Sequence, residues 1–212
     1  MSDLNHKYSN KEEKLNIITH AFGLILSVIA FPFLVLKSLY FDGFWKPASI
    51  IIFGLSLIIL YAASTFYHAA TKPKLRRRLN IFDHAAIYVL IAGTYTPFTI
   101  ITLEGNTGWI IFGLTWFFAL SGIILKLFFT GKFDKLSTIM YVLMGWQIVF
   151  AIKPLLEKLS EEGLFWLFAG GVFYTIGAVL YSIKKIPYNH AIFHFFVLGG
   201  SISHFISIYY YI

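Results

Sequence analysis

The chain reads His190-Ala191-Ile192-Phe193-His194 where its last apolar segment begins. On an α-helix, residues four positions apart lie about 40° apart around the axis and roughly 6 Å apart along it. Both imidazole rings can therefore reach one point beside the helix, and a transition metal is the usual reason for such a pair inside a membrane. The alternative is that both rings lie in the headgroup layer and are hydrated.

The composition is that of an integral membrane protein. Of 212 residues, 58% are hydrophobic and 13% are charged, whereas soluble domains carry about a quarter charged residues. Because cysteine is absent, any metal must be bound by histidine, carboxylate or water. The net charge of +7 would suit nucleic acid, but the basic residues lie in short loops between apolar segments, which indicates membrane orientation instead.

Seven apolar segments follow a polar start, and we expect membrane lipids to surround them. Each is long enough to cross a hydrocarbon core of about 30 Å, the fifth only barely. They must be helices, because backbone groups in lipid have to be satisfied internally. The sequence predicts an all-α bundle of seven transmembrane helices at 16–39, 47–70, 81–103, 107–129, 136–153, 163–183 and 189–211. Residues 1–15 form the predicted tail and 16–212 the transmembrane domain.

The positive charges predict the orientation. With Lys126 counted as a loop residue, all but four of the 17 lysines and arginines lie on the same side as the N-terminus. The four on the other side are Lys37, Lys46, Lys153 and Lys158. Since basic residues stay in the cytoplasm, the sequence predicts a cytoplasmic N-terminus and an external C-terminus in a bacterial plasma membrane.

This orientation brings five of the seven histidines and the only carboxylate predicted inside the membrane to one end of the bundle. The groups predicted at the cytoplasmic end of their helices are Asn16, His20, His68, Asp83, His84, His190 and His194. Ionisable groups at membrane depth are costly and mark a functional site. Three neutral imidazoles suit Zn²⁺ and leave a fourth position for water, which is the pattern of a catalytic zinc.

Two further polar residues are candidates for catalysis. Asp83 can hold a water and accept its proton; its alternative role is to support a histidine or to pair with the Arg76–Arg78 run. Ser64, one turn before His68, can orient a ligand or a substrate carbonyl. Its alternative is a hydroxyl bonded back to its own helix.

At this point the sequence resembles a known family. The pattern Ser64-x-x-x-His68, then Asp83, then His190-x-x-x-His194, resembles the haemolysin III group of the progestin and adipoQ receptor family, which includes the adiponectin receptors. A Glu-x(2–3)-Asn-x-x-x-His motif of the same family is similar to the stretch that contains Glu12, Glu13, Asn16 and His20. The resemblance covers essentially the whole chain.

The resemblance implies a zinc ion held by His68, His190 and His194, with Asp83 reaching it through water. It also implies kinship with alkaline ceramidases and other membrane hydrolases. We interpret Asn16 and His20 as supporting residues around this site.

The remaining features have simpler interpretations. His84 is expected to make a packing or headgroup contact, and His204 a helix–helix hydrogen bond. The glycine pairs 170–171 and 199–200 are expected to permit close helix packing. The Arg76–Arg78 run is expected to fix topology and to touch anionic lipid.

We therefore expect a metal-dependent hydrolase of lipid amides or esters whose substrate arrives from the bilayer. The alternatives are a receptor or membrane-state sensor with a structural zinc, and a cytolysin. The sequence argues against a pore-forming cytolysin. It leaves the substrate, the oligomeric state and the occurrence of catalysis open.

Overall fold

The computed structural model describes residues 8–130 and 134–212, and within these ranges the chain is helical without β-strands. Its helices are α1 (Asn10–Ser38), α2 (Trp45–Ala69), α3 (Pro73–Pro97), the π-helix η1 (Phe98–Leu103), α4 (Gly105–Phe129), α5 (Asp134–Gly145), the 3₁₀-helix η2 (Gln147–Ala151), α6 (Ile152–Lys158), α7 (Glu161–Ser182) and α8 (Asn189–Tyr211).

Seven segments of the described chain are long and apolar enough to cross a membrane, as the sequence predicts. Many large apolar side chains point outward from them, among them Ile18, Phe117, Phe128 and Phe150. Such an exposed apolar surface is stable in hydrocarbon and not in water. The chain is therefore a multi-pass membrane protein.

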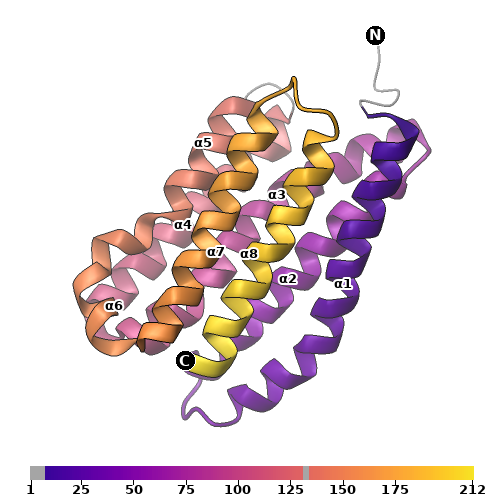
Figure 1. The fold of residues 1–212 in the computed structure, drawn as a ribbon. Coiled ribbons are helices and arrows are strands. Elements are labelled where there is room, and N and C mark those ends of the chain that lie inside the picture. The colour runs from indigo at the N-terminus through magenta and orange to yellow at the C-terminus, as the bar shows by residue number, and fades with distance from the viewer. Residues whose placement is uncertain (1–7, 131–133) are drawn as a thin grey trace.

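The arrangement of the helices gathers the polar residues at one end. α1 packs against α2 and α8, and α3 packs between α2 and α4. α1, α3 and α8 begin at the end of the bundle where α2 and α4 finish, while the C-terminus lies at the opposite end (Figure 1). That the first of these ends faces the cytoplasm remains a prediction from the charges.

Two helix starts differ from the sequence-based segments. α1 begins at Asn10, where the Ser9 hydroxyl accepts a hydrogen bond from the Glu12 backbone N–H and caps the helix. α3 begins at Pro73, a residue well suited to a first helical position because its missing N–H is not needed there. Apolarity marks only the part of a helix inside lipid, so both extra turns were missed. As a result, Arg76 lies on α3 and not in a loop.

The fifth span is not one continuous helix, which corrects the predicted 136–153 segment. The span runs over Leu136–Lys158, and the α-helix stops at Gly145 before resuming at Ile152. The Tyr95 hydroxyl donates to the Gly145 carbonyl at 2.8 Å and accepts from the Ile148 N–H at 2.8 Å. One phenol thus satisfies two backbone groups that the break would leave unpaired in lipid.

Lys126 is a second correction, because it is not a loop residue. It belongs to the last turn of α4, and only 2% of its surface is exposed. A buried charge contributes little to the loop asymmetry that sets orientation. The predicted orientation does not depend on it, since most other basic residues still lie on the N-terminal side.

Candidate metal centre

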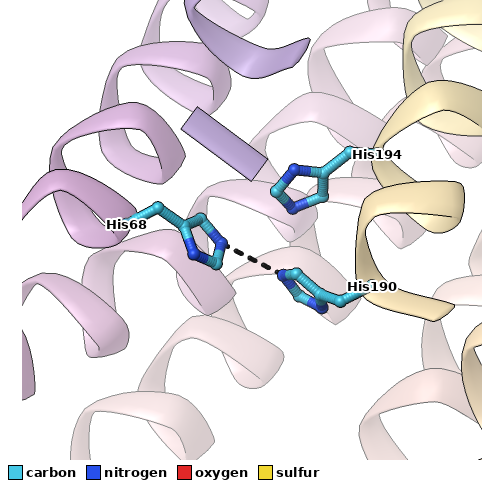
Figure 2. Close-up of side chains that lie close together, drawn as sticks. All are labelled: His68, His190 and His194. Atoms are coloured by element: carbon cyan, nitrogen blue, oxygen red, sulfur yellow. Dashed lines mark hydrogen bonds between the residues drawn. The ribbon is translucent and has the colours of Figure 1, made fainter. Parts of the chain in front are cut away.

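Three histidines converge at the end of the bundle where α8 begins. His68 comes from the last turn of α2, and His190 and His194 come from the first turns of α8 (Figure 2). One ring nitrogen of each lies within 4.8 Å of the others, and all three side chains are buried. The Nε2 atoms of His68 and His190 are 3.1 Å apart. This group can hold a metal ion.

The other nitrogen of each ring faces a hydrogen-bond acceptor. Nδ1 of His68 is 2.7 Å from the Glu13 carboxylate, and Nδ1 of His190 is 3.2 Å from the Tyr8 hydroxyl. Nδ1 of His194 is 3.3 Å from the Asn16 backbone carbonyl. With the proton on Nδ1 in each case, Nε2 carries the lone pair that can bind a metal. Such outer partners are the usual means of orienting histidine ligands.

Glu13 links the centre to the end of α2. One carboxylate oxygen faces His68, and the other accepts a hydrogen bond from Arg76. The same guanidinium donates to the Ala70 carbonyl at 3.3 Å and lies over the Tyr67 ring. Arg76 thus satisfies a carbonyl at the end of α2 while it neutralises Glu13. The sequence left open a pairing of Asp83 with the Arg76–Arg78 run. In the structure the salt bridge of Arg76 is with Glu13.

His20 lies directly against the cluster. Its ring stacks on His194 with centroids 3.5 Å apart and meets Tyr61 edge-on. Neither of its ring nitrogens has a hydrogen-bond partner within the described chain. The Asn16 side-chain amide lies 3.4 Å from Nδ1 of His68. Both residues therefore pack around the histidines, Asn16 through its backbone carbonyl, which accepts from His194, and His20 through its ring face.

A cavity of about 130 Å³ opens beside the histidines. Its lining includes His20, Asp83, His190 and His194, so the one acidic residue predicted for the site shares a cavity with two of the three histidines. Asp83 is buried, and one of its carboxylate oxygens lies 3.8 Å from Nδ1 of His84. Most of the remaining wall is apolar.

Ser64 is fully buried, and its hydroxyl has no hydrogen-bond partner in the described part of the chain. The alternative of a hydroxyl bonded back to its own helix is therefore wrong. A buried polar group without a protein partner needs water, an ion or a ligand. Ser64 lies one helical turn before His68, where such a group would be beside the cluster.

The other two histidines among the described residues have ordinary partners. His84 donates from Nδ1 to the Asn80 carbonyl at 2.8 Å within its own helix. His204 donates from Nε2 to the Leu167 carbonyl at 3.0 Å, which confirms the predicted helix–helix hydrogen bond between α8 and α7.

Two residues next to the three histidines were not singled out from the sequence alone. Glu13 was named only as part of a family motif. Its spacing from Asn16 and His20, three and then four residues, nevertheless places all three on one helix face. Tyr8 precedes every apolar segment, and no sequence pattern marked it as a functional residue. Burial raises the pKa of its phenol well above the usual value, so the hydroxyl stays neutral against His190.

The fold and this cluster define a class: a seven-helix membrane protein with a centre of three histidines that can hold a metal. A family model described as "Haemolysin-III related" matches residues 8–205. The chain therefore belongs to the haemolysin III group of the progestin and adipoQ receptor family.

Curated relatives agree with this assignment. The chain is 45% identical over 204 residues to "Hemolysin-3 homolog" of Bacillus subtilis (strain 168), an alignment that covers 96% of each chain. It is 45% identical over 202 residues to "Hemolysin-3" of Bacillus cereus, covering 95% of this chain and 92% of the relative. It is 27% identical over 211 residues to human "Monocyte to macrophage differentiation factor", covering 95% and 84%.

Proposed function

We propose that this protein is a zinc-dependent intramembrane hydrolase of lipid amides or esters, resembling alkaline ceramidases. One observation carries the proposal: three buried histidines bring one ring nitrogen each within 4.8 Å of the others, and two of them line a cavity together with Asp83. Their Nδ1 atoms are held by Glu13, Tyr8 and Asn16.

The donor set suits zinc. A tetrahedral Zn²⁺ with Zn–N bonds of about 2.0–2.1 Å holds neighbouring ligand nitrogens about 3.3 Å apart, close to the 3.1 Å between His68 and His190. Imidazole is a common zinc ligand, and three protein ligands leave one position for water or substrate. The Glu13 carboxylate on Nδ1 of His68 has the arrangement that strengthens such ligands.

The residues of the chain would divide the chemistry among them. When bound, zinc would lower the pKa of a water toward about 7 and polarise the substrate carbonyl. Asp83 would accept the proton from that water and pass it to the leaving nitrogen or oxygen. Ser64 would supply a hydrogen bond to the water or the carbonyl. Arg76 would keep Glu13 ionised beside His68.

The cavity supports a lipid substrate. It lies among the transmembrane helices, and His190 and His194 are part of its wall, so a molecule in it can place its polar end beside the cluster. Ile91, Val142 and Val197 contribute to its apolar wall, which suits an acyl chain and excludes bulk water. A substrate would therefore enter from the bilayer.

The test is hydrolysis by purified protein in defined detergent. We expect release of fatty acid from a panel of ceramides and ester lipids, loss of release after chelation, and recovery on adding Zn²⁺. Release that survives complete removal of metal would contradict the proposal. So would inactivity of zinc-loaded protein against the whole panel.

Cytolysis is a second candidate, favoured by the name of the Bacillus cereus relative, "Hemolysin-3". We propose that any lysis follows from lipid hydrolysis, because the described spans are embedded apolar helices. The Asp83→Asn variant should then lose haemolysis and lipid release together, whereas purified wild type should show both. Haemolysis by a variant without lipid release would make cytolysis a separate activity.

A further inference from the structure

An imidazole of α1 stacks on one of the three histidines of the centre. The ring of His20 lies nearly parallel to that of His194, with centroids 3.5 Å apart and an interplanar angle of 12°. An imidazole binds a metal along the lone pair of its nitrogen, in the plane of the ring, so the plane of a ligand ring decides where the metal can lie. The ring that stacks on His194 therefore helps to aim its Nε2.

The hydrogen bonds of His194 leave much of this orientation to packing. Its Nδ1 lies 3.3 Å from the Asn16 carbonyl and 3.4 Å from the Thr19 hydroxyl. Both distances exceed the roughly 2.7–3.2 Å of a usual N–H···O bond. His68, by contrast, faces a carboxylate oxygen at 2.7 Å. His194 is thus held less firmly by hydrogen bonds than His68, and its ring contacts matter more.

The position of His20 is in turn set by ring contacts. Its side chain is buried, and neither ring nitrogen has a hydrogen-bond partner within the described chain. Besides its stack on His194, the His20 ring meets Tyr61 of α2 edge-on, with centroids 5.1 Å apart. Stacked and edge-to-face pairs are the favourable arrangements of such rings. A line of three rings therefore leads from Tyr61 to the centre.

Tyr61 is fixed by both neighbouring helices. Its side chain is 1% exposed, and its hydroxyl donates to the Ser201 hydroxyl of α8 at 2.8 Å. On the α1 side, a Cβ at Gly23 would lie only 2.5 Å from the Tyr61 ring. Tyr61 precedes His68 by seven residues, and Ser201 follows His194 by seven. Since seven residues make about two turns, this hydrogen bond joins the same faces of α2 and α8 two turns from the cluster.

We propose that Tyr61 is a positioning residue of the metal centre and acts through the ring of His20. Tyr61 fixes the place of the His20 ring, and this ring fixes the plane of His194. His20 serves as a flat packing surface, so its nitrogens are not required. The proposal rests on the metal centre of the proposed function and not on hydrolysis. Its alternative is a His20 nitrogen that bonds water or a ligand in the cavity, which His20 also lines.

The probe is Co²⁺, a stand-in for Zn²⁺ whose visible absorption reports the geometry of its ligands. It is added to metal-free, full-length protein in detergent, and its affinity is measured by competition with a chelator. His20→Phe keeps a flat ring and removes both nitrogens, whereas His20→Ala removes the ring. Tyr61→Leu removes the phenol. Its matched control is Tyr174→Leu, because the Tyr174 hydroxyl bonds the same Ser201 at 3.0 Å while its ring contacts His204.

A second pair of variants disturbs Tyr61 without replacing it. The Cβ of Gly23→Ala presses on the Tyr61 ring from α1. The matched control is Gly54→Ala, whose Cβ would lie 2.7 Å from the ring of Phe31 instead. Melting temperatures are recorded for all variants. A purely structural defect lowers the melting temperature but leaves the cobalt spectrum of the folded protein unchanged.

We expect His20→Phe to bind Co²⁺ with the affinity and spectrum of wild type. His20→Ala should bind it about tenfold more weakly, the usual effect of losing a partner that orients a histidine ligand. Tyr61→Leu and Gly23→Ala should also weaken binding and alter the spectrum, because the plane of His194 is no longer fixed. Both should be unchanged in the two controls, even where their melting temperatures fall.

An equal loss of affinity in His20→Phe and His20→Ala would overturn the proposal, because a nitrogen and not the ring would then be needed. Wild-type affinity and spectrum in Tyr61→Leu would also overturn it. If Tyr61→Leu does not fold, the same result in Gly23→Ala decides against it. Equal changes in a variant and its matched control would overturn it as well, since the effect would not run through His20.

The same measurements separate this proposal from the proposed function. The expected cobalt results in a protein that hydrolyses no lipid would contradict the proposed hydrolase alone. Lipid hydrolysis by wild type, with unchanged cobalt binding in all His20, Tyr61 and Gly23 variants, would contradict the role of Tyr61 alone. Wild type that binds no Co²⁺ would overturn this proposal together with the metal centre.

Discussion

Oε2 of Glu13 lies 2.7 Å from Nδ1 of His68, although 55 residues separate them in the chain. The contact joins the first turn of α1 to the last turn of α2. It fixes which nitrogen of His68 carries the proton, and therefore which one can bind a metal. The Arg76 guanidinium on the other oxygen stops Glu13 from being an isolated buried charge.

The first prediction concerns this contact. Glu13→Gln keeps the shape of the side chain but removes the charge that makes His68 a better ligand. We expect zinc affinity to fall by about 10–100-fold, measured by competition with a chromophoric chelator. Glu12→Gln, one position away and without a side-chain hydrogen bond to the cluster within the described chain, should bind zinc normally. Unchanged affinity in Glu13→Gln would refute the role of this carboxylate.

The second prediction separates catalysis from structure at Asp83. Asparagine is nearly isosteric but cannot accept a proton, and the three imidazoles are untouched. Asp83→Asn should therefore retain zinc while lipid turnover falls by roughly 10²–10⁴-fold. Zinc content and fatty-acid release are measured on the same preparation. Undiminished turnover would rule out Asp83 as the base, and loss of zinc would make it a structural partner of the metal.

The third prediction concerns the glycine pair of α7. A Cβ at Gly170 would lie 2.3 Å from the His204 ring, which is fixed by its bond to Leu167, whereas one at Gly171 would meet nothing closer than 3.8 Å. Gly170→Ala should destabilise the protein by about 1–3 kcal/mol. Gly171→Ala should be neutral or stabilising by up to about 1 kcal/mol. The melting temperature in detergent should therefore be lower for Gly170→Ala than for Gly171→Ala. The reverse order would contradict the packing described.

The fourth prediction tests orientation. The excess of basic residues at the end of the bundle that holds the histidines predicts that this end faces the cytoplasm. A reporter fused after Ile212 should therefore be external, and one inserted at Lys72 should be cytoplasmic. A reporter at Ile212 that reads as cytoplasmic would reverse the orientation or require a different number of spans.

Much of the fold was predictable because lipid imposes simple rules. Segments of about 20 apolar residues had to be helices, and α7 and α8 lie within two residues of their predicted limits. The break at Gly145 was not predictable, because it depends on the phenol of Tyr95, which is remote in sequence. Lys126 was misplaced because the sequence does not show which face of α4 is turned inward.

The sequence was enough to predict which histidines form the cluster and at which end of the bundle they lie. The spacing of His190 and His194 put both on one helix face, and counting spans put His68 at the same end. The partners of the rings depend on how α1 docks on α2 and α8. Neither Tyr8 nor the Glu13–Arg76 pair could be assigned to particular histidines until that docking was known.

The most direct test of the account is the metal content of the purified protein and four single variants. The account predicts about one zinc per chain in wild type, because three imidazoles define one site. The zinc content should fall sharply in each of three variants, His68→Ala, His190→Ala and His194→Ala. It should be unchanged in His204→Ala, because His204 is a buried histidine outside the cluster. Full zinc retention in all three cluster variants, or no bound metal in wild type, would contradict the assignment of the centre.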